Sequence, residues 1–414
     1  MNAILDNYLT SNQKVLVEHL KQLVSIPTVN PPGRSYKECV TFLKTSLESI
    51  GFETQVFKVP DDKIRNILPT KDKYSRYNLF AKWNLGKKKT IHFNAHYDVV
   101  PVSGSWMYPP FSGHVEKGVL YGRGAADMKG SISALIYALG AFNAEKLKPS
   151  FNIEVSFVCD EEIGGLFGTG FIKEMALTNA DYVIVCEGAS GNRIGVGHNG
   201  VLWLTIQLRG KTAHASRPQR GRNAFDQLTA LGVQLHDYLR KISARGYTSP
   251  DGVKMNPTLS LGGTFGQAEG GKTNIVPGDA WFTLDRRLLP TEDIPQVEGE
   301  IRDYVTKVGR DIKDFDATIT STLAINPYRL DHRSPLPQAL ACIVASIRNC
   351  SPKFSHTPGF TDAHYFGNGL SIPTVGYGTG GSNYHGVNEQ VEINDLLTTS
   401  RVYAEFMDRG FPAS

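Results

Sequence analysis

The stretch "FNIEVSFVCDEEIGG", residues 151–165, joins a predicted strand to three successive acids, Asp160, Glu161 and Glu162. Adjacent carboxylates repel one another, and the end of a packed strand offers little water to screen them. Strands alternate with helices around this stretch, which is typical of a sheet covered on both faces. The sequence therefore predicts an α/β fold in which a positive charge compensates a group of acids at a strand end.

Hydrophobic periodicity predicts the elements along the chain. Apolar residues at helical spacing predict helices at residues 12–25, 35–50, 130–142, 223–239, 292–308 and 335–347. Apolar or alternating runs predict strands at residues 53–59, 77–83, 89–96, 151–158, 182–186, 202–210, 257–263, 280–288, 316–323 and 372–378.

The pattern of the sequence changes near Gly197. The stretch "LWLTIQLRG", residues 202–210, alternates strictly between apolar and other side chains, as in a strand with one wet or interface-facing side. The following order, strand-helix-strand-strand-helix-strand, is that of a small ferredoxin-like α+β domain. We expect this domain at residues 197–323, inserted into an α/β domain formed by residues 1–196 and 324–414. The alternative is one continuous domain.

Composition and charge exclude several classes of function. The chain has 414 residues and a formal net charge of +4, and its basic residues are scattered, which argues against a nucleic-acid partner. The one compact basic run, Lys87 to Lys89, is interpreted as a solvated hairpin turn. No stretch reaches the ~18 apolar residues of a membrane span. Five cysteines without a CxxC pair indicate reduced thiols and a cytoplasmic protein.

Polar side chains recur just past the predicted strands. His96 and Asp98 follow one strand, Asp127 lies in a glycine-rich turn before a helix, and Glu187 and His385 follow two further strands. The carboxyl ends of strands in an open α/β sheet meet at one crevice, so these residues can lie together.

Two imidazoles and three or more carboxylates, with no cysteine among them, are typical of a zinc-type site. Five such ligands suffice for two metal ions if one carboxylate bridges. A further free carboxylate can take the proton of a metal-bound water, whose pKa the metal lowers toward about 7. Each residue alone has a simpler interpretation, such as a helix N-cap for Asp127 or a packed side chain for either histidine.

Several stretches, in this order, resemble a known family. They are "IPTVNPPG" (26–33), "WMYPPFSGHVEKGVLYGRGAADMKG" (106–130), "DEEIGG" (160–165), "GKTAHAS" (210–216), "TNIVPGDAWFTLDRRLLP" (273–290), "GFTDAHYF" (359–366) and "YHGVNE" (384–389). The family is that of the co-catalytic zinc deacylases and peptidases, which includes acetylornithine deacetylase, succinyl-diaminopimelate desuccinylase, aminoacylase and glutamate carboxypeptidase. The resemblance covers nearly the whole chain.

The resemblance implies a zinc-peptidase-like catalytic domain with a mostly parallel sheet and two Zn²⁺ per subunit, with Co²⁺ or Mn²⁺ as possible substitutes. The residues that it implies are His96, Asp127 and Glu187 for one ion, and Asp127, Glu162 and His385 for the other, with Asp127 bridging. Asp98 would orient the His96 imidazole, although a role as a direct ligand stays open. Glu161 would be the general base and then the general acid.

The resemblance also implies that residues 197–323 form a lid and dimerisation domain in a homodimer. His214 would enter the partner subunit's active site and stabilise the tetrahedral oxyanion. Asn274 and Arg287 would hold substrate oxygens, with Arg286 as the alternative to Arg287, and Asp362 is a further substrate-pocket candidate.

The function implied is hydrolysis of the amide bond of an N-acyl amino acid by a metal-bound hydroxide, as in acetylornithine deacetylase or succinyl-diaminopimelate desuccinylase. A dipeptidase or carboxypeptidase acting on a short peptide is the alternative, because the catalytic motifs do not separate these substrates. A non-catalytic relative is a third interpretation, which the presence of all five ligands and Glu161 disfavours.

Overall fold

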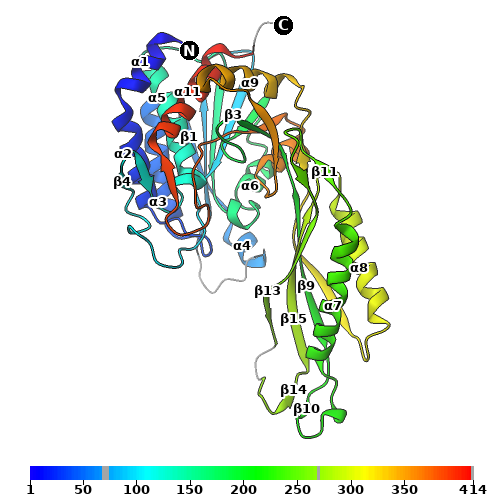
Figure 1. Cartoon of the computed structure of the whole chain (residues 1–414). Coiled ribbons are helices and arrows are strands. Elements are labelled where there is room, and N and C mark those ends of the chain that lie inside the picture. Colours follow the sequence, from blue (N-terminus) through cyan, green and yellow to red (C-terminus); the bar gives the residue numbers. More distant parts are fainter. Residues whose placement is uncertain (68–73, 268–270, 412–414) are drawn as a thin grey trace. The chain divides into compact units, whose positions relative to one another are not determined.

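The computed structural model describes residues 1–67, 74–267 and 271–411, and the chain divides into two compact units (Figure 1). The first unit comprises Met1–Gly197, Arg329–Thr357 and Thr361–Ser414. The second comprises His198–Tyr328 and Pro358–Phe360.

A nine-stranded sheet forms the centre of the first unit, and its central strands are parallel. Its strand order is β1 (Glu53–Lys58), β2 (Tyr77–Trp83), β6 (Asn152–Val158), β3 (Thr90–His96), β7 (Tyr182–Val185), β19 (Thr374–Gly376), β8 (Arg193–His198) and β17 (Tyr328–Arg329), with β18 (Lys353–Thr357) also pairing with β8. The strands β6, β3, β7 and β19 run parallel to their neighbours in this group, whereas β1, β2 and β8 pair antiparallel. The predicted mostly parallel central sheet is confirmed.

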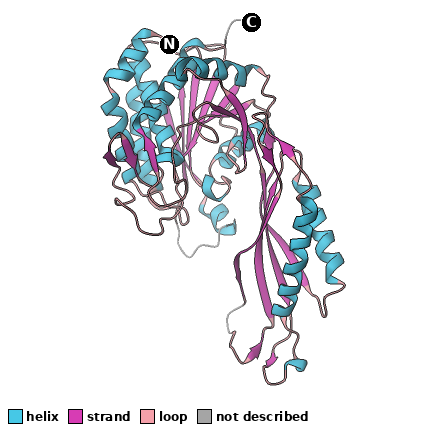
Figure 2. Ribbon diagram, in the orientation of Figure 1, coloured by secondary structure: helices cyan, strands magenta, loops and turns pink. Residues whose placement is uncertain are grey.

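Helices cover both faces of this sheet (Figure 2). Along β3, Ile91 and Phe93 join the main hydrophobic core with α5 (Gly130–Ala144). The alternate residues face the other helices: Asn94 Nδ2 donates to Thr169 Oγ1 of α6 (Thr169–Glu174) at 2.9 Å. Because successive side chains of a strand point to opposite faces, His96 at the end of β3 continues the polar row of Asn94.

The first unit contains further helices. They are α1 (Ala3–Ser11), α2 (Gln13–Ser25), α3 (Tyr36–Ile50), α4 (Asp61–Ile67), α9 (Pro335–Arg348), α10 (Ala363–Leu370) and α11 (Ile393–Arg409). Of these, α1, α2, α3 and α11 contact α5. Four of the predicted helices, at residues 12–25, 35–50, 130–142 and 335–347, match α2, α3, α5 and α9.

The predicted hairpin turn at Lys87 to Lys89 is wrong. The run connects β2 to β3, but β6 lies between these two strands in the sheet and pairs with both. Strands that are consecutive in sequence need not be neighbours in a sheet, and here a later strand occupies the position between them.

The second unit contains the predicted ferredoxin-like order of elements. They are β9 (Gly200–Arg209), α7 (Ala224–Ile242), β13 (Thr258–Gly266), β15 (Asp279–Leu288), α8 (Ile294–Gly309) and β16 (Ala317–Ile325). The four strands form an antiparallel sheet in the order β13-β15-β9-β16. The apolar side of β9, with Leu202, Leu204 and Ile206, is fully buried in a separate core that includes residues of α7 and α8.

A second, shorter pairing in this unit joins β10 (Ala213–His214) to β14 (Ile275–Val276). In the described part of the chain, no helix has both the length and the apolar character that a membrane span requires.

Candidate metal centre

Six acidic and imidazole side chains of the first unit meet at one edge of the central sheet. His96 is the last residue of β3, Glu161 and Glu162 follow β6, and Glu187 follows β7. His385 lies in the loop after β19, and Asp127 lies in the turn just before α5. The parallel strands therefore place residues that are far apart in the sequence close together at their carboxyl ends.

The five predicted ligands form two groups that share Asp127. His96 Nε2 lies 3.1 Å from Asp127 Oδ1 and 3.7 Å from Glu187 Oε2. His385 Nε2 lies 3.3 Å from Asp127 Oδ2 and 3.1 Å from Glu162 Oε2. In each group the candidate ligand atoms all lie within 4.8 Å of one another. The two oxygens of Asp127 thus face different imidazoles, which is the arrangement of a bridging carboxylate.

The electrostatics of this cluster fit bound cations. Glu162 Oε1 and Glu187 Oε1 are buried, and neither has a hydrogen-bond partner among the described residues. Burial raises the pKa of Glu162 to about 7, and burial likewise raises the pKa of Glu187. Hydrogen bonds to Asp127 and Glu162 raise the pKa of His385 to about 10. A pair of divalent cations would satisfy the buried oxygens and compensate the crowded acids, and the nitrogen and oxygen donors suit zinc-type ions.

Glu161 is the acid of the cluster that belongs to neither group. Its side chain is buried, and its Oε2 lies 4.0 Å from His96 Nε2. Burial, followed by the negative charge of Glu187, raises the pKa of Glu161 well above its usual value. A carboxylate of high proton affinity beside a metal centre can accept and return a proton.

Asp98 holds both the acidic turn and the His96 ring, and it belongs to neither ligand group. Its carboxylate accepts hydrogen bonds from the backbone N–H groups of Glu161 at 3.2 Å and Glu162 at 3.4 Å. Its backbone carbonyl oxygen lies 3.0 Å from His96 Nδ1, whereas its nearest carboxylate oxygen lies 3.6 Å from that nitrogen. The closer contact to the imidazole therefore comes from the main chain of Asp98.

Asp160, the first of the three acids, is compensated by an arginine. Arg76 Nε donates to Asp160 Oδ2 at 2.7 Å, and both side chains are about 1% exposed. The other oxygen of Asp160 accepts from Tyr36 Oη at 2.9 Å and from Asn30 Nδ2 at 3.0 Å. Sequence analysis missed Arg76, because it lies 84 residues before Asp160 and carries no recognisable motif.

Glu389 is a second residue that sequence analysis missed. Its carboxylate accepts hydrogen bonds from the backbone N–H groups of Gly124, Ala126 and Asp127, each at 3.0 Å. It also pairs with buried Arg123 at 2.7 Å. Glu389 therefore fixes the turn that presents the shared carboxylate of Asp127. The available signal was its position at the end of "YHGVNE", four residues after His385.

The predicted oxyanion-stabilising residue His214 and the predicted substrate-binding residue Asn274 lie beside each other in the second unit. His214 on β10 is exposed, and its Nδ1 lies 2.8 Å from Ser216 Oγ. Ala215, the next residue, donates its N–H to the backbone oxygen of Asn274 at 2.9 Å.

The third of these residues, Arg287, lies on β15 and is partly exposed. Arg287 pairs with Asp285, at 2.8 Å from Nε to Oδ1. Its neighbour Arg286 is fully buried and donates to both oxygens of Glu292. Arg287 is thus the more accessible of the two guanidinium groups.

Asp362 lies in the first unit, directly before α10. It is buried, and it accepts a hydrogen bond from Thr169 Oγ1 at 2.7 Å. Burial raises the pKa of Asp362 to about 8. Its carboxylate lies beside the acidic turn, because a Cβ atom built at Gly165 would clash with Asp362 Oδ1. Its negative charge also contributes to the raised pKa of Glu161.

The fold and this cluster define a metal-dependent hydrolase, and comparisons with known proteins agree. The sequence profile described as "Peptidase family M20/M25/M40" matches residues 92–409, which is most of the chain. The chain belongs to this family, and the resemblance of its motifs is confirmed.

Individual relatives share the length and the fold of this chain. A protein of Paracoccus denitrificans named succinyl-diaminopimelate desuccinylase is 27% identical over 81% of this chain and 86% of its own. An M20 family metallo-carboxypeptidase from Sulfolobus solfataricus has a TM-score of 0.77 at 23% identity, covering 95% of this chain and 98% of its own. A di-peptidase from Saccharomyces cerevisiae has a TM-score of 0.78 at 17% identity, covering 98% and 97%. At these identities the two structures show a shared fold, and they do not show a shared substrate.

Proposed function

We propose that this protein hydrolyses the amide bond of an N-acyl amino acid, as acetylornithine deacetylase and succinyl-diaminopimelate desuccinylase do. The observation that carries the proposal is the Asp127 carboxylate, whose two oxygens face two different imidazoles, together with the Glu161 carboxylate, which belongs to neither ligand group. The relative named succinyl-diaminopimelate desuccinylase supports the acyl-amino-acid class.

Two divalent ions, Zn²⁺ or in its place Co²⁺ or Mn²⁺, fit the two ligand groups. His96, Asp127 and Glu187 would hold one ion, and Asp127, Glu162 and His385 the other. When bound, such ions polarise a substrate carbonyl and lower the pKa of a coordinated water.

The side chains of this chain would move the proton. Glu161 would accept the proton of the attacking water and then donate it to the leaving amine, which needs a carboxylate of raised pKa in a buried position. Asp98 would keep Glu161 and Glu162 in place through its hydrogen bonds to their N–H groups.

The second unit would complete the substrate site in a homodimer. His214, exposed on β10, would stabilise the developing oxyanion in the partner subunit's site. Asn274 and Arg287 would hold the substrate's oxygens, and Asp362 would line the pocket. All five cysteines are free thiols, which supports our placement of the enzyme in a reducing cytoplasm.

Two neighbouring substitutions test these roles. Glu161→Gln should keep both metal ions and lose nearly all turnover, because only the proton carrier is removed. Glu162→Ala should lower the metal content, because a ligand is removed. Metal analysis beside turnover of N-acetyl amino acids measures both. Turnover close to that of the wild type in Glu161→Gln, or two retained ions in Glu162→Ala, would exclude the respective role.

A dipeptidase or carboxypeptidase is the second candidate, favoured by the solved structures of the same fold that carry those names. The same centre serves both reactions, so the pocket decides. Turnover of N-acetyl amino acids, N-succinyl-diaminopimelate and dipeptides by zinc- and cobalt-loaded protein separates them. Preference for a dipeptide over every acylated amino acid would overturn the first candidate.

A further inference from the structure

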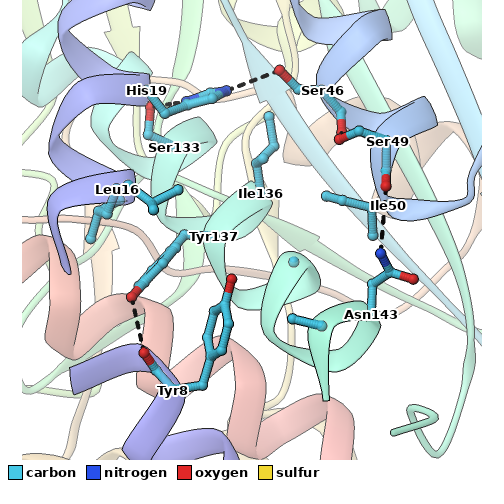
Figure 3. Close-up of a pocket in the computed structure, with 13 residues that line it drawn as sticks. Tyr8, Leu16, His19, Ser46, Ser49, Ile50, Ser133, Ile136, Tyr137 and Asn143 are labelled. Atoms are coloured by element: carbon cyan, nitrogen blue, oxygen red, sulfur yellow. Dashed lines mark hydrogen bonds between the residues drawn. The ribbon is translucent and has the colours of Figure 1, made fainter. Parts of the chain in front are cut away.

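A pocket of about 300 Å³ lies among the helices α1, α2, α3 and α5, apart from the metal centre (Figure 3). Its walls include the apolar side chains of Leu16, Ile50 and Ile136. None of its 13 lining residues belongs to the ligand groups described above. The volume lies at the lower end of the range found for sites of small organic ligands.

The polar groups around His19 in the pocket wall already have hydrogen-bond partners. His19 Nδ1 lies 2.9 Å from Ser133 Oγ, and His19 Nε2 lies 3.2 Å from Ser46 Oγ. Ser46 Oγ donates to the backbone oxygen of Phe42 at 3.1 Å. These contacts match every donor to an acceptor when His19 carries its proton on Nε2 and Ser133 donates to Nδ1. A ligand is therefore not needed to satisfy the His19 side of the pocket.

The pocket carries no charge near neutral pH. Its lining contains no lysine, arginine, aspartate or glutamate. Burial lowers the pKa of His19 to about 4, so this ring stays neutral. A charged ligand would lose its hydration here without gaining a counterion, which is costly. The lining therefore favours an uncharged ligand over the amino acid carboxylates of the proposed substrates.

One hydroxyl remains available to a ligand. Tyr8 Oη has no hydrogen-bond partner among the described residues, and Figure 3 shows it directed toward Ile136 and the Tyr137 ring. The Tyr8 and Tyr137 rings lie 6.1 Å apart between centroids, at an angle of 36°. Tyr137 Oη is engaged, because it donates to the Leu9 backbone oxygen at 2.8 Å.

The space beside Gly140 is open. A Cβ atom built at this residue would meet no heavy atom within 4 Å outside its own helix. The absence of a side chain on this turn of α5 therefore leaves room in the pocket, and a methyl group could be added there without a clash.

We propose that this pocket binds a small, uncharged aromatic molecule of the phenol class. Its ring would lie against Leu16, Ile136 and the Tyr137 ring, where apolar and aromatic contacts are available. Its hydroxyl would form a hydrogen bond with Tyr8 Oη. The proposal is independent of the reaction at the metal centre.

Calorimetric titration of the metal-loaded full chain with phenol tests the proposal. Gly140→Leu fills the pocket and should weaken phenol binding at least about tenfold, because the ring and the new side chain occupy the same space. Gly140→Ala is the matched control and should bind within about twofold of the wild type, because a single methyl group leaves most of the volume. Tyr8→Phe should weaken binding about fivefold, the worth of one net hydrogen bond. Benzoate, which has the same ring and a negative charge, should bind at least about tenfold more weakly than phenol.

Equal phenol affinity in the wild type and Gly140→Leu would overturn the proposal, as would benzoate binding as tight as that of phenol. Ser49→Trp provides a second blocking variant at an exposed lining residue, so the protein should still fold and phenol binding should be abolished. Retention of phenol binding in a folded Ser49→Trp protein would count against the site.

Discussion

At the scale of single residues, the position of Asp127 depends on the carboxylate of Glu389, which belongs to neither ligand group. The Glu389 carboxylate accepts hydrogen bonds from three backbone N–H groups of the turn that contains Asp127, and Arg123 neutralises the charge of Glu389. Mutation of partners that orient metal ligands typically lowers metal affinity by about 10- to 100-fold.

Replacement of this carboxylate should therefore weaken metal binding. Glu389→Gln removes the charge that pairs with buried Arg123 and one acceptor of the turn, so we expect metal affinity to fall about 10- to 100-fold. The stability of the fold should also fall, by about 3 kcal/mol, because the arginine is left without its partner. Metal titration and urea unfolding measure the two effects.

Glu392→Gln is the matched control, because Glu392 is exposed and lies three residues further along the chain. It should change neither quantity. Metal affinity in Glu389→Gln equal to that of the control would show that the turn holds Asp127 without the carboxylate.

The sequence predicts the residues of the cluster better than it predicts their supports. His96, Asp127, Glu187 and His385 could be named because each lies just past a strand or in a recognisable motif. Arg76 could not, because its role depends on its distance in space from Asp160, and nothing in its local sequence marks it. Glu389 lay inside a recognised motif, but its bonds go to backbone N–H groups, which no side-chain pattern reveals.

At the scale of elements, the strands with strong alternation or unbroken apolar runs were predictable, and the order of strands in the sheet was not. The residues of β9 alternate because one face packs on α7 and α8, so their period is visible in the sequence. The insertion of β6 between β2 and β3 depends on contacts made 60 residues or more later in the chain. Local sequence therefore suggested a hairpin where the sheet has none.

His19 of α2, which contacts Ser46 of α3 and Ser133 of α5, gives a prediction for how the stability of the fold depends on pH. The folded pKa of His19 is about 4, below the ordinary value of 6.5. Its contribution to stability is therefore fully present above pH 6.5 and is lost as the pH falls toward 4, because the unfolded chain binds the proton first. The loss amounts to at most about 3 kcal/mol, and partial exposure of the ring reduces it.

Replacement of this histidine should remove that part of the pH dependence. In metal-free protein, the drop in urea midpoint between pH 7 and pH 5 should be smaller for His19→Gln than for the wild type. His236→Gln, at an exposed position of α7, should drop as the wild type does. An equal drop in all three proteins would mean that His19 does not titrate differently on unfolding.

At the scale of the whole molecule, the proposed roles of Glu161 and His214 belong to different units of the chain, Glu161 to the first and His214 to the second. If His214 acts in the partner subunit's site, a dimer of two different inactive variants contains one complete site. One subunit would supply Glu161 and the other His214. Random mixing of Glu161→Gln with His214→Ala gives about half mixed dimers, so about a quarter of all sites should be complete.

Co-refolding or co-expression of these two variants should therefore restore about a quarter of wild-type turnover, whereas each variant alone stays nearly inactive. Glu161→Gln mixed with the double variant Glu161→Gln, His214→Ala is the control, because no subunit in that mixture carries Glu161. Sedimentation confirms that dimers form in both mixtures. Turnover no greater than the sum of the separate variants, in a mixture shown to contain mixed dimers, would place His214 in its own subunit's site or outside the reaction.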